Sequence, residues 1–260
     1  MRRSRSVPKR AARLRATKAL RDATRQATLR MSQLVHGRLQ RVQKAIVSAL
    51  GVRLDAEDEL IDIEFLIGRL DRLTVEEITR LLELEGYDTG LIKSASGVAA
   101  SNGAAVTELT GIKGLARFSP ERVAAWRKEN TDLIVSLCRD QVADLKSQIL
   151  ERTQGLRVEE IRGLIQERFG VSESRADLIA RDQTLKLNAQ MTRENYKRAN
   201  VNKYVWTTTR DERVREEHAE LDGQVFSFDD PPEPGNPGED FQCRCTAFPV
   251  FEEEEGVSDE

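Results

Sequence analysis

Residues 11–50 restrict the fold more than any other stretch, because they contain no proline and are rich in Ala, Leu, Arg and Gln. These residue types have high helix propensity, so the stretch predicts one long helix. Its second half places apolar residues three or four positions apart, which indicates a buried stripe. That stripe consists of Leu34, Val35, Leu39, Val42, Ile46 and Leu50. The first half is basic nearly all round, which favours a projecting arm.

The charge is divided unevenly along the chain. Residues 1–50 hold 14 Lys or Arg and one acidic residue, Asp22, for a net charge of +13, whereas the other 210 residues hold 27 basic and 43 acidic residues, for −16. A basic arm on an acidic body points to a polyanion, most often DNA or RNA. The alternatives are a solvated charged helix and an arm that pairs with an acidic protein surface. The candidate DNA-binding residues are Arg2, Arg3, Arg5, Lys9, Arg10, Arg13, Arg15, Lys18, Arg21 and Arg25.

Further helices are predicted in the middle of the chain. Thr74, with Glu77 three residues later, is typical of a capping box, and Gly86 of a helix end. Ser119 and Pro120 are typical of the first turn of another helix. The predicted helical segments are 55–73, 74–86, 119–152, 157–170 and 172–199, the last capped by Ser172. Between them, the Gly-, Ala- and Ser-rich residues 94–106 predict a flexible loop or hinge.

The composition changes after Asn200. Residues 201–209 are rich in β-branched and aromatic side chains and predict a strand. A short second strand is predicted at 224–228 and a third strand at 243–251, and a short helix ends at Gly223. The predicted fold class is therefore mainly α with a small C-terminal α+β module.

The number of cysteines and the hydropathy of the chain restrict the compartment in which the protein is expected. Charged residues make up 33% and hydrophobic residues 39% of the 260 residues, which is typical of a soluble, helix-rich protein. No apolar run approaches the roughly 20 residues that cross a bilayer, and no secretory signal is found. Three cysteines, with Cys138 alone on a predicted helix, make a poor disulfide framework. We expect synthesis in a reducing cytoplasm and no membrane partner.

Cys243 and Cys245, in PGEDFQCRC, raise the question of a metal site. Together with His218 they supply three zinc ligands, and structural zinc usually takes four, so Asp211, Asp222 or water would complete the set. A disulfide between the two cysteines would close a strained small ring. The alternative is that both thiols are packed on a strand, with His218 bonded to Asp211 or Asp222. A structural zinc is therefore one of two hypotheses.

The other polar residues near this motif favour roles in holding the fold. Asp211 is placed to cap a short helix and to pair with an arginine. Residues 229–240 (DDPPEPGNPGED) form a predicted proline–glycine loop, called the proline loop below. Arg213 is expected to reach the acidic pair at 229–230 and to lock the proline loop over the strands. Catalysis has little support: the chain has two histidines, His36 is on the basic arm, and no zinc-protease, phosphate-loop or nucleophile-elbow motif is present. Cysteine–histidine catalysis at Cys243 or Cys245 is the remaining enzymatic alternative.

Several segments, in order and with their spacing, resemble the phage Mu F-like head morphogenesis family, the minor capsid proteins of tailed phages and prophages. The resemblance covers about residues 119–250, and residues 1–118 match no motif. The segments are WRKENTDLI (126–134), SRADLIARDQTLKLN (174–188), YVWTTTRDERVREEHAELDG (204–223), FSFDDPP (226–232) and PGEDFQCRC (237–245), followed by Ala247 and Pro249. Some members carry Cys-x-x-Cys where this chain has Arg215 and His218. Both versions retain a terminal Cys-x-Cys, which hints at a shared metal-like clip rather than shared catalysis.

The resemblance implies a structural role in the virion: association with the portal protein, the major head protein and the head interior, with DNA met through the basic arm. The alternatives are a metal- or thiol-dependent nuclease and a DNA-binding module acting outside any particle. The resemblance also implies that Arg181, Asp182 and Gln183 anchor the strand-rich end to the long helix, and Trp206 and Gly223 fall within its motifs. The expected regions are a basic arm and helix (1–50), a helical region (51–155) with a flexible loop near 87–118, a head morphogenesis domain (156–251) and an acidic tail (252–260).

Overall fold

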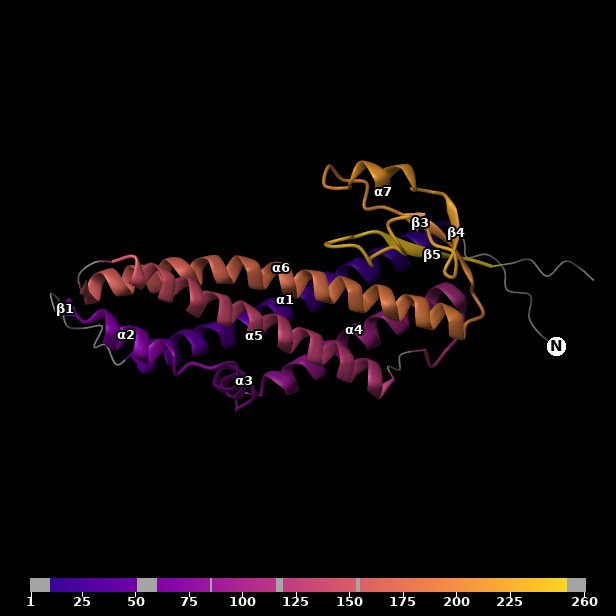
Figure 1. Cartoon of the computed structure of the whole chain (residues 1–260). Coiled ribbons are helices and arrows are strands. Elements are labelled where there is room, and N and C mark those ends of the chain that lie inside the picture. Colours follow the sequence, from indigo (N-terminus) through magenta and orange to yellow (C-terminus); the bar gives the residue numbers. More distant parts are fainter. Residues whose placement is uncertain (1–9, 51–59, 85, 116–118, 153–154, 252–260) are drawn as a thin grey trace, which may run out of the picture. The chain divides into compact units, whose positions relative to one another are not determined.

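A computed structural model describes residues 10–50, 60–84, 86–115, 119–152 and 155–251 (Figure 1). The helices are α1 (Arg10–Leu50), α2 (Ile63–Leu70), α3 (Val75–Leu84), α4 (Tyr87–Thr110), α5 (Pro120–Leu150), α6 (Val158–Arg198) and α7 (Glu216–Glu220). The strands are β1 (Leu60–Ile61), β2 (Leu156–Arg157), β3 (Lys203–Thr207), β4 (Val225–Ser227) and β5 (Thr246–Val250). The predicted class, mainly α with a small C-terminal α+β module, is confirmed.

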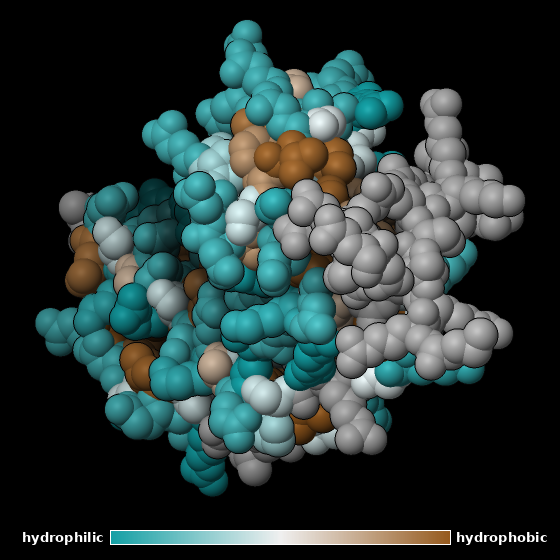
Figure 2. Space-filling view, turned by 90° about the vertical axis from the view of Figure 1, so that its right-hand side faces the viewer, coloured by the Kyte–Doolittle hydropathy of each residue, from teal (hydrophilic) through white to brown (hydrophobic). Residues whose placement is uncertain are grey.

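The chain divides into two compact units. The helical unit contains residues 29–94 and 120–181, and the sheet unit contains residues 1–28, 95–119 and 182–260. Helices α1, α4 and α6 each contribute one part to each unit. Among the described residues, no helix has both the length and the apolar character that crossing a membrane requires. Figure 2 shows a face of the molecule that is largely hydrophilic, with hydrophobic side chains gathered in small areas.

The helical unit buries the stripe predicted on α1. Leu34 is half-buried, and the other five members of the stripe are at most 1% exposed. Helices α2 and α3 pack against α5, and the short strands β1 and β2 pair antiparallel, with Ile61 opposite Leu156. The predicted cap of α3 is present, since Thr74 Oγ1 accepts the Glu77 amide at 3.2 Å. Cys138 lies in this core, where burial raises the pKa of its thiol to about 12.

The flexible loop predicted at 94–106 is wrong, because these residues belong to α4. Small side chains suit a helix that is approached closely by its neighbours as well as they suit a loop. At Gly90, in the helical unit, an added Cβ would lie 2.5 Å from Leu34 Cδ1. In the sheet unit, Ala95 and Ala99 are buried and Asn102 is fully enclosed. This burial outweighs the helix-propensity cost of the glycines, about 1 kcal/mol each.

The helix break predicted before Ser172 is also wrong. Helix α6 runs without interruption from Val158 to Arg198. Glycine and serine in a helix interior cost about 1 kcal/mol or less each, which tertiary packing overrides. Ile165 precedes the expected break and Ala176 and Ala180 follow it, and all three are buried.

The sheet unit contains a three-stranded antiparallel sheet of order β4-β3-β5 (Figure 1). Tyr204, on the central strand, is opposite Phe226 and Pro249, and Trp206 is opposite Ala247. Both aromatic side chains of β3 are fully buried and share a core with Tyr196, which is near the end of α6. The last strand begins at Thr246, later than the predicted residue 243, so Cys243 and Cys245 precede it.

Candidate functional site

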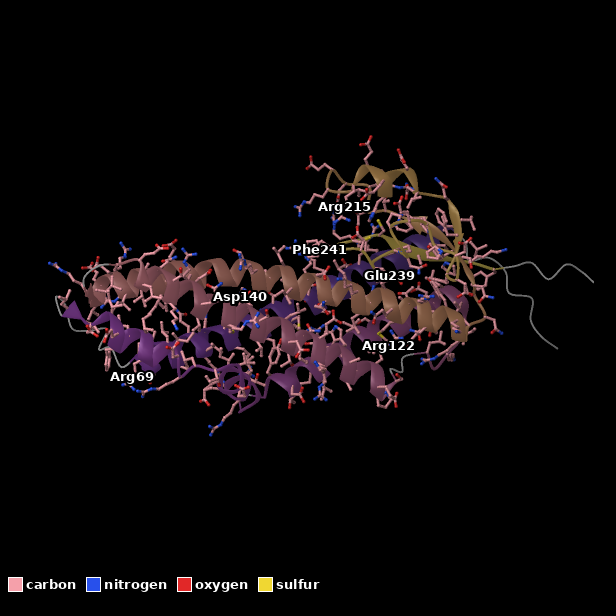
Figure 3. The ribbon with its side chains drawn as sticks, viewed as in Figure 1. Arg69, Arg122, Asp140, Arg215, Glu239 and Phe241 are labelled. Atoms are coloured by element: carbon pink, nitrogen blue, oxygen red, sulfur yellow. The ribbon has the colours of Figure 1, made fainter. Side chains whose placement is uncertain are left out.

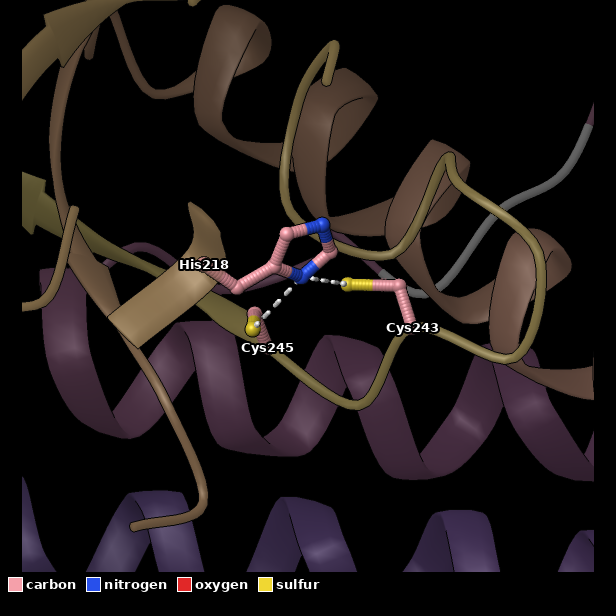
Figure 4. A group of neighbouring side chains, drawn as sticks. All are labelled: His218, Cys243 and Cys245. Atoms are coloured by element: carbon pink, nitrogen blue, oxygen red, sulfur yellow. Dashed lines mark hydrogen bonds between the residues drawn. The ribbon is translucent and has the colours of Figure 1, made fainter. Parts of the chain in front are cut away.

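Three buried side chains of the sheet unit meet around one imidazole nitrogen. His218 Nδ1 lies 3.6 Å from Cys243 Sγ and 3.6 Å from Cys245 Sγ (Figure 4). The three residues are 2%, 3% and 8% exposed, and both thiols are free of disulfide bonds. The structure thus brings together the three residues that the sequence marked as metal-ligand candidates.

Helix α7 carries His218 and is fixed to the central strand of the sheet. Trp206 on β3 contacts the imidazole edge-on, with ring centroids 5.4 Å apart and planes at 78°. Gly223, after α7, has φ +87° and donates its amide to Trp206 O at 2.8 Å. A left-handed backbone favours glycine, so Gly223 turns the chain back along β3 without strain.

The loop that carries the cysteines is held by helix α6. Gln242, just before Cys243, has φ +55°, a conformation that costs a non-glycine residue about 1–2 kcal/mol. Its amide donates to Asp182 Oδ1 on α6 at 2.8 Å. Lys186 Nζ lies 2.8 Å from the other carboxylate oxygen of Asp182, which is itself 5% exposed. Asp182 therefore supports the turn that presents Cys243.

Gly238 makes a second connection between this loop and the cluster. Its φ is +88°, and its amide donates to Cys243 Sγ at 3.3 Å. An added Cβ would lie 2.7 Å from the Ala189 Cβ of α6, so only glycine fits here without a shift. This role of Gly238 was not predicted, although the proline–glycine pair at 237–238 was an available signal.

The carboxylate of Asp240 lies beside Nε2, the second ring nitrogen of His218. Its Oδ2 is 3.4 Å from His218 Nε2. Arg215 Nη1 pairs with the same carboxylate, and Arg215 Nη2 donates to Phe241 O at 2.5 Å (Figure 3). The ring therefore has two sulfur atoms beside Nδ1 and a carboxylate beside Nε2. Asp240 was missed, although it lies only three residues before Cys243.

The two thiols are not electrostatically equivalent. The pKa of Cys243 is lowered, mainly because the Cys245 thiol donates to it, with smaller contributions from the Gly238 amide and from His218. The pKa of Cys245 is raised by the same shared proton and by burial. Two cysteine sulfur atoms next to an imidazole suit a borderline-soft cation, because thiolate and imidazole are its preferred ligands.

Two predicted partners of His218 are placed elsewhere. Asp211 pairs with Arg244 through two contacts of 2.6 Å, and its pKa is lowered to about 2, mainly by those hydrogen bonds. It also accepts the Arg213 amide at 3.1 Å, but the N-cap position of α7 belongs to Arg215, so the predicted helix cap is wrong.

Asp222 accepts the Thr208 amide at 2.8 Å and contacts Arg210 Nε at 3.0 Å. The carboxylate beside His218 is Asp240, so the predicted bond from His218 to Asp211 or Asp222 is wrong.

Arg193 occupies the position that was predicted for Arg213. Its Nη2 donates to Phe228 O at 3.0 Å and lies 4.0 Å from Asp229 Oδ1. Its Nη1 is 3.6 Å from Glu239, which in turn accepts the amide of the buried Asn236. Arg193, on α6, therefore holds the proline loop, whereas Arg213 is exposed.

The predicted DNA-binding residues fall into three groups. Arg2, Arg3, Arg5 and Lys9 lie outside the described residues, and Arg10, Arg13 and Arg15 lie on the first turns of α1. Lys18, Arg21 and Arg25 are exposed, and Arg21 Nη2 donates to Thr208 O at 3.1 Å. Leu20 and Ala27 are buried in the same helix, so the expectation of an arm projecting over its whole first half is wrong from Leu20 onward.

Residues 143–248 match the family described as Phage Mu protein F like protein, which confirms the resemblance over this segment. The segment contains His218, Cys243, Cys245 and the residues that hold them. An uncharacterized protein of Haemophilus influenzae (strain ATCC 51907 / DSM 11121 / KW20 / Rd) is 36% identical over 139 residues. The alignment covers 53% of this chain and 31% of that protein, so the chain spans about a third of its relative's length. A comparison with solved structures found no match.

Proposed function

We propose that the chain is a minor capsid protein that acts in head morphogenesis of a tailed phage or prophage. The observation that carries this proposal is the match of residues 143–248 to the Phage Mu protein F like family. That segment includes all of α6, β3, α7, β4 and the cysteine loop. Its polar contacts connect these elements to one another, as expected of a structural module.

The proposed partners are the portal protein and the major head protein, contacted through helical surfaces, and packaged DNA, contacted through the N-terminal arm. The proposed location is the head interior near the portal. The net charge of +13 over residues 1–50 and the exposure of Lys18 and Arg25 support the DNA contact. Sequence-independent binding to phosphates needs only such a cationic surface.

Burial of the cysteine–histidine cluster supports a structural role over an enzymatic one. His218, Cys243 and Cys245 are each at most 8% exposed. A nucleic-acid strand would have to reach the thiolate or a metal-bound water to be cleaved, and these atoms are enclosed. We therefore propose that the chain has no turnover of its own.

Locating the protein in purified particles tests the proposal directly. Phage or induced prophage particles would be analysed by mass spectrometry and cryo-EM, with a tagged copy of this chain as marker. The expected result is a few copies per particle, near the portal, and co-purification with portal subunits. A chain absent from particles, or metal-stimulated DNA cleavage that is lost in His218→Ala, would contradict the proposal.

A further inference from the structure

We propose that His218 Nδ1 and the Sγ atoms of Cys243 and Cys245 bind one zinc ion, with water as the fourth ligand. Asp240 is the carboxylate that orients the histidine ring for this role. The inference concerns the sheet unit itself and does not depend on the role in head morphogenesis.

The distances in the cluster match those around a tetrahedral zinc ion. Zinc bonds of about 2.3 Å to sulfur and about 2.0–2.1 Å to nitrogen place these two ligand atoms about 3.6 Å apart. His218 Nδ1 is 3.6 Å from each of the two sulfur atoms. Both nitrogen–sulfur separations therefore already match those around zinc, and the three ligand atoms all lie within 4.8 Å of one another.

Hydrogen bonding alone does not explain why both sulfur atoms lie at the same distance from His218 Nδ1. In either tautomer Nδ1 makes one ordinary hydrogen bond, as acceptor or as donor, so it pairs with only one of the two sulfur atoms at a time. Yet Cys243 and Cys245 are equally close to it, and all three side chains are buried. A cation between the three atoms satisfies them together, and a dipositive ion with two thiolates is neutral overall, which suits a buried site.

Asp240 is placed to supply the outer contact that metal-binding histidines usually have, at ion-pair distance, while His218 Nε2 makes no hydrogen bond within the described residues. A zinc-bound imidazole generally donates its other N–H to a carboxylate, which fixes the tautomer and the ring orientation. Asp240 Oδ2 lies 3.4 Å from His218 Nε2 and is held in place by Arg215. Gly238 adds an amide hydrogen bond to Cys243 Sγ at 3.3 Å, which stabilises a thiolate ligand.

The fourth ligand follows from the residues around the cluster. Within the described part of the chain, the potential ligand atoms gather in two sets, His218–Cys243–Cys245 and Glu217–His218–Asp240. The carboxylates of the second set face Nε2, away from the sulfur atoms. They are therefore outer partners, and solvent completes the tetrahedron. Two thiolates and an imidazole favour zinc over magnesium or calcium, which prefer oxygen ligands.

Metal titration of the full chain tests the site. Protein prepared in metal-free buffer would be titrated with cobalt(II), whose tetrahedral thiolate complexes have intense visible and near-ultraviolet bands, and then with zinc. We expect about one equivalent of cobalt, displaced by zinc. Cys243→Ser/Cys245→Ser is expected to lose the bands, and Cys138→Ser, which changes the third thiol only, to keep them. A folded wild-type chain that binds neither metal, or bands that survive in the double variant, would overturn the proposal.

X-ray absorption on the zinc-loaded wild-type chain keeps the test valid if the double variant does not fold. The expected shell has two sulfur atoms at about 2.3 Å, one imidazole nitrogen and one oxygen. A shell without sulfur would overturn the assignment.

The role of Asp240 has a separate test. Asp240→Asn is expected to weaken zinc affinity about 10- to 100-fold while leaving the cobalt–thiolate bands in place. Asp222→Asn is the matched control, because it also weakens an arginine pair of the sheet unit, the one with Arg210, while Asp222 belongs to neither set of potential ligands. Equal affinities in Asp240→Asn and the wild type would overturn the positioning role.

Discussion

The carboxylate of Asp182 accepts the amide of Gln242 at 2.8 Å, and so connects helix α6 to the residue that precedes Cys243. This contact stabilises a left-handed backbone, since Gln242 has φ +55°. The position of Cys243 beside His218 therefore depends on a residue 60 positions earlier in the chain.

Removing this carboxylate should destabilise the sheet unit. Asp182→Ala leaves the Gln242 amide without its acceptor, and we expect a loss of about 1–3 kcal/mol in the free energy of unfolding. Asp182→Asn keeps an acceptor oxygen and should lose less. Chemical denaturation measures both, and hydrogen exchange should show the change first at residues 242–245. Equal stability of Asp182→Ala and the wild type would contradict this role.

Gly238 should tolerate alanine less well than the other left-handed glycines. At Gly223 (φ +87°) an added Cβ would meet nothing within 4 Å, so Gly223→Ala measures the backbone cost alone, about 1–2 kcal/mol. Gly238→Ala adds a contact of 2.7 Å with Ala189 Cβ and should cost more. Denaturation of both variants gives the comparison.

A double-mutant cycle isolates the steric part of that cost. Combining Gly238→Ala with Ala189→Gly removes the clash, so the two changes should cost less together than the sum of the single variants. If the losses in unfolding free energy are additive, the loop in Gly238→Ala moves away from α6 without a free-energy cost.

A buried asparagine network should hold α4 against α6 in the sheet unit. Asn102 Nδ2 donates to Asn188 Oδ1 at 2.9 Å and to Thr192 Oγ1 at 2.7 Å, and its Oδ1 accepts from Asn195 at 2.8 Å. Asn102→Ala leaves these partners unsatisfied, and we expect a loss of about 1–3 kcal/mol in denaturation experiments. Glu108→Ala, at an exposed position of α4, is the control and should change stability by less than about 0.5 kcal/mol.

The asparagine network is also an example of contacts that local sequence patterns do not predict. Local signals predicted the long α1, the Thr74 cap and the start of α5 at Pro120, because spacing and capping act within one turn. The small residues of α4 predicted a loop, since composition does not distinguish a hinge from a helix whose neighbours come close. The choice depends on Asn188 and Asn195, which lie about 90 residues away.

The candidate site likewise contains residues that the sequence predicted and residues that it did not. His218, Cys243 and Cys245 could be selected by their chemistry and by the motif spacing. Asp211 and Asp222 were wrongly predicted as partners of His218, because Asp211 pairs with Arg244 and Asp222 pairs with Arg210. The orientation of Asp240 and the fit of Gly238 against Ala189 depend on how the proline loop folds onto α6, which no local pattern encodes.

Acid should weaken the Asp211–Arg244 pair in a defined pH range. Because Arg244 lowers the pKa of Asp211 to about 2, the pair stabilises the folded chain above the unfolded-state pKa of about 3.9. That contribution is lost as the pH falls from there through about 2. Titration of the Asp211 carboxyl by NMR should show its pKa rising toward 3.9 in Arg244→Gln. A pKa that stays near 2 in this variant would exclude Arg244 as the main cause.

The basic arm should bind DNA without sequence preference and with steep salt dependence. If about six or more phosphates are contacted, counterion release lowers affinity by roughly 10³-fold or more between 50 and 200 mM salt. Deleting residues 1–30 would also remove the buried Leu20 and Ala27, so substitution is the sharper test. Replacing Arg2, Arg3, Arg5 and Lys9 with Gln should reduce the slope of log K against log salt by about 3 to 4.

The control for that experiment is a pair of charge-removing substitutions outside the arm. Lys203→Gln and Arg213→Gln remove exposed basic residues of the sheet unit. They should leave the salt slope unchanged, because the excess positive charge is confined to residues 1–50. Fluorescence anisotropy with two duplexes of unrelated sequence measures affinity and sequence preference together. If the arm variant binds both duplexes as tightly as the wild type at every salt concentration, the arm docks onto an acidic protein surface instead of DNA.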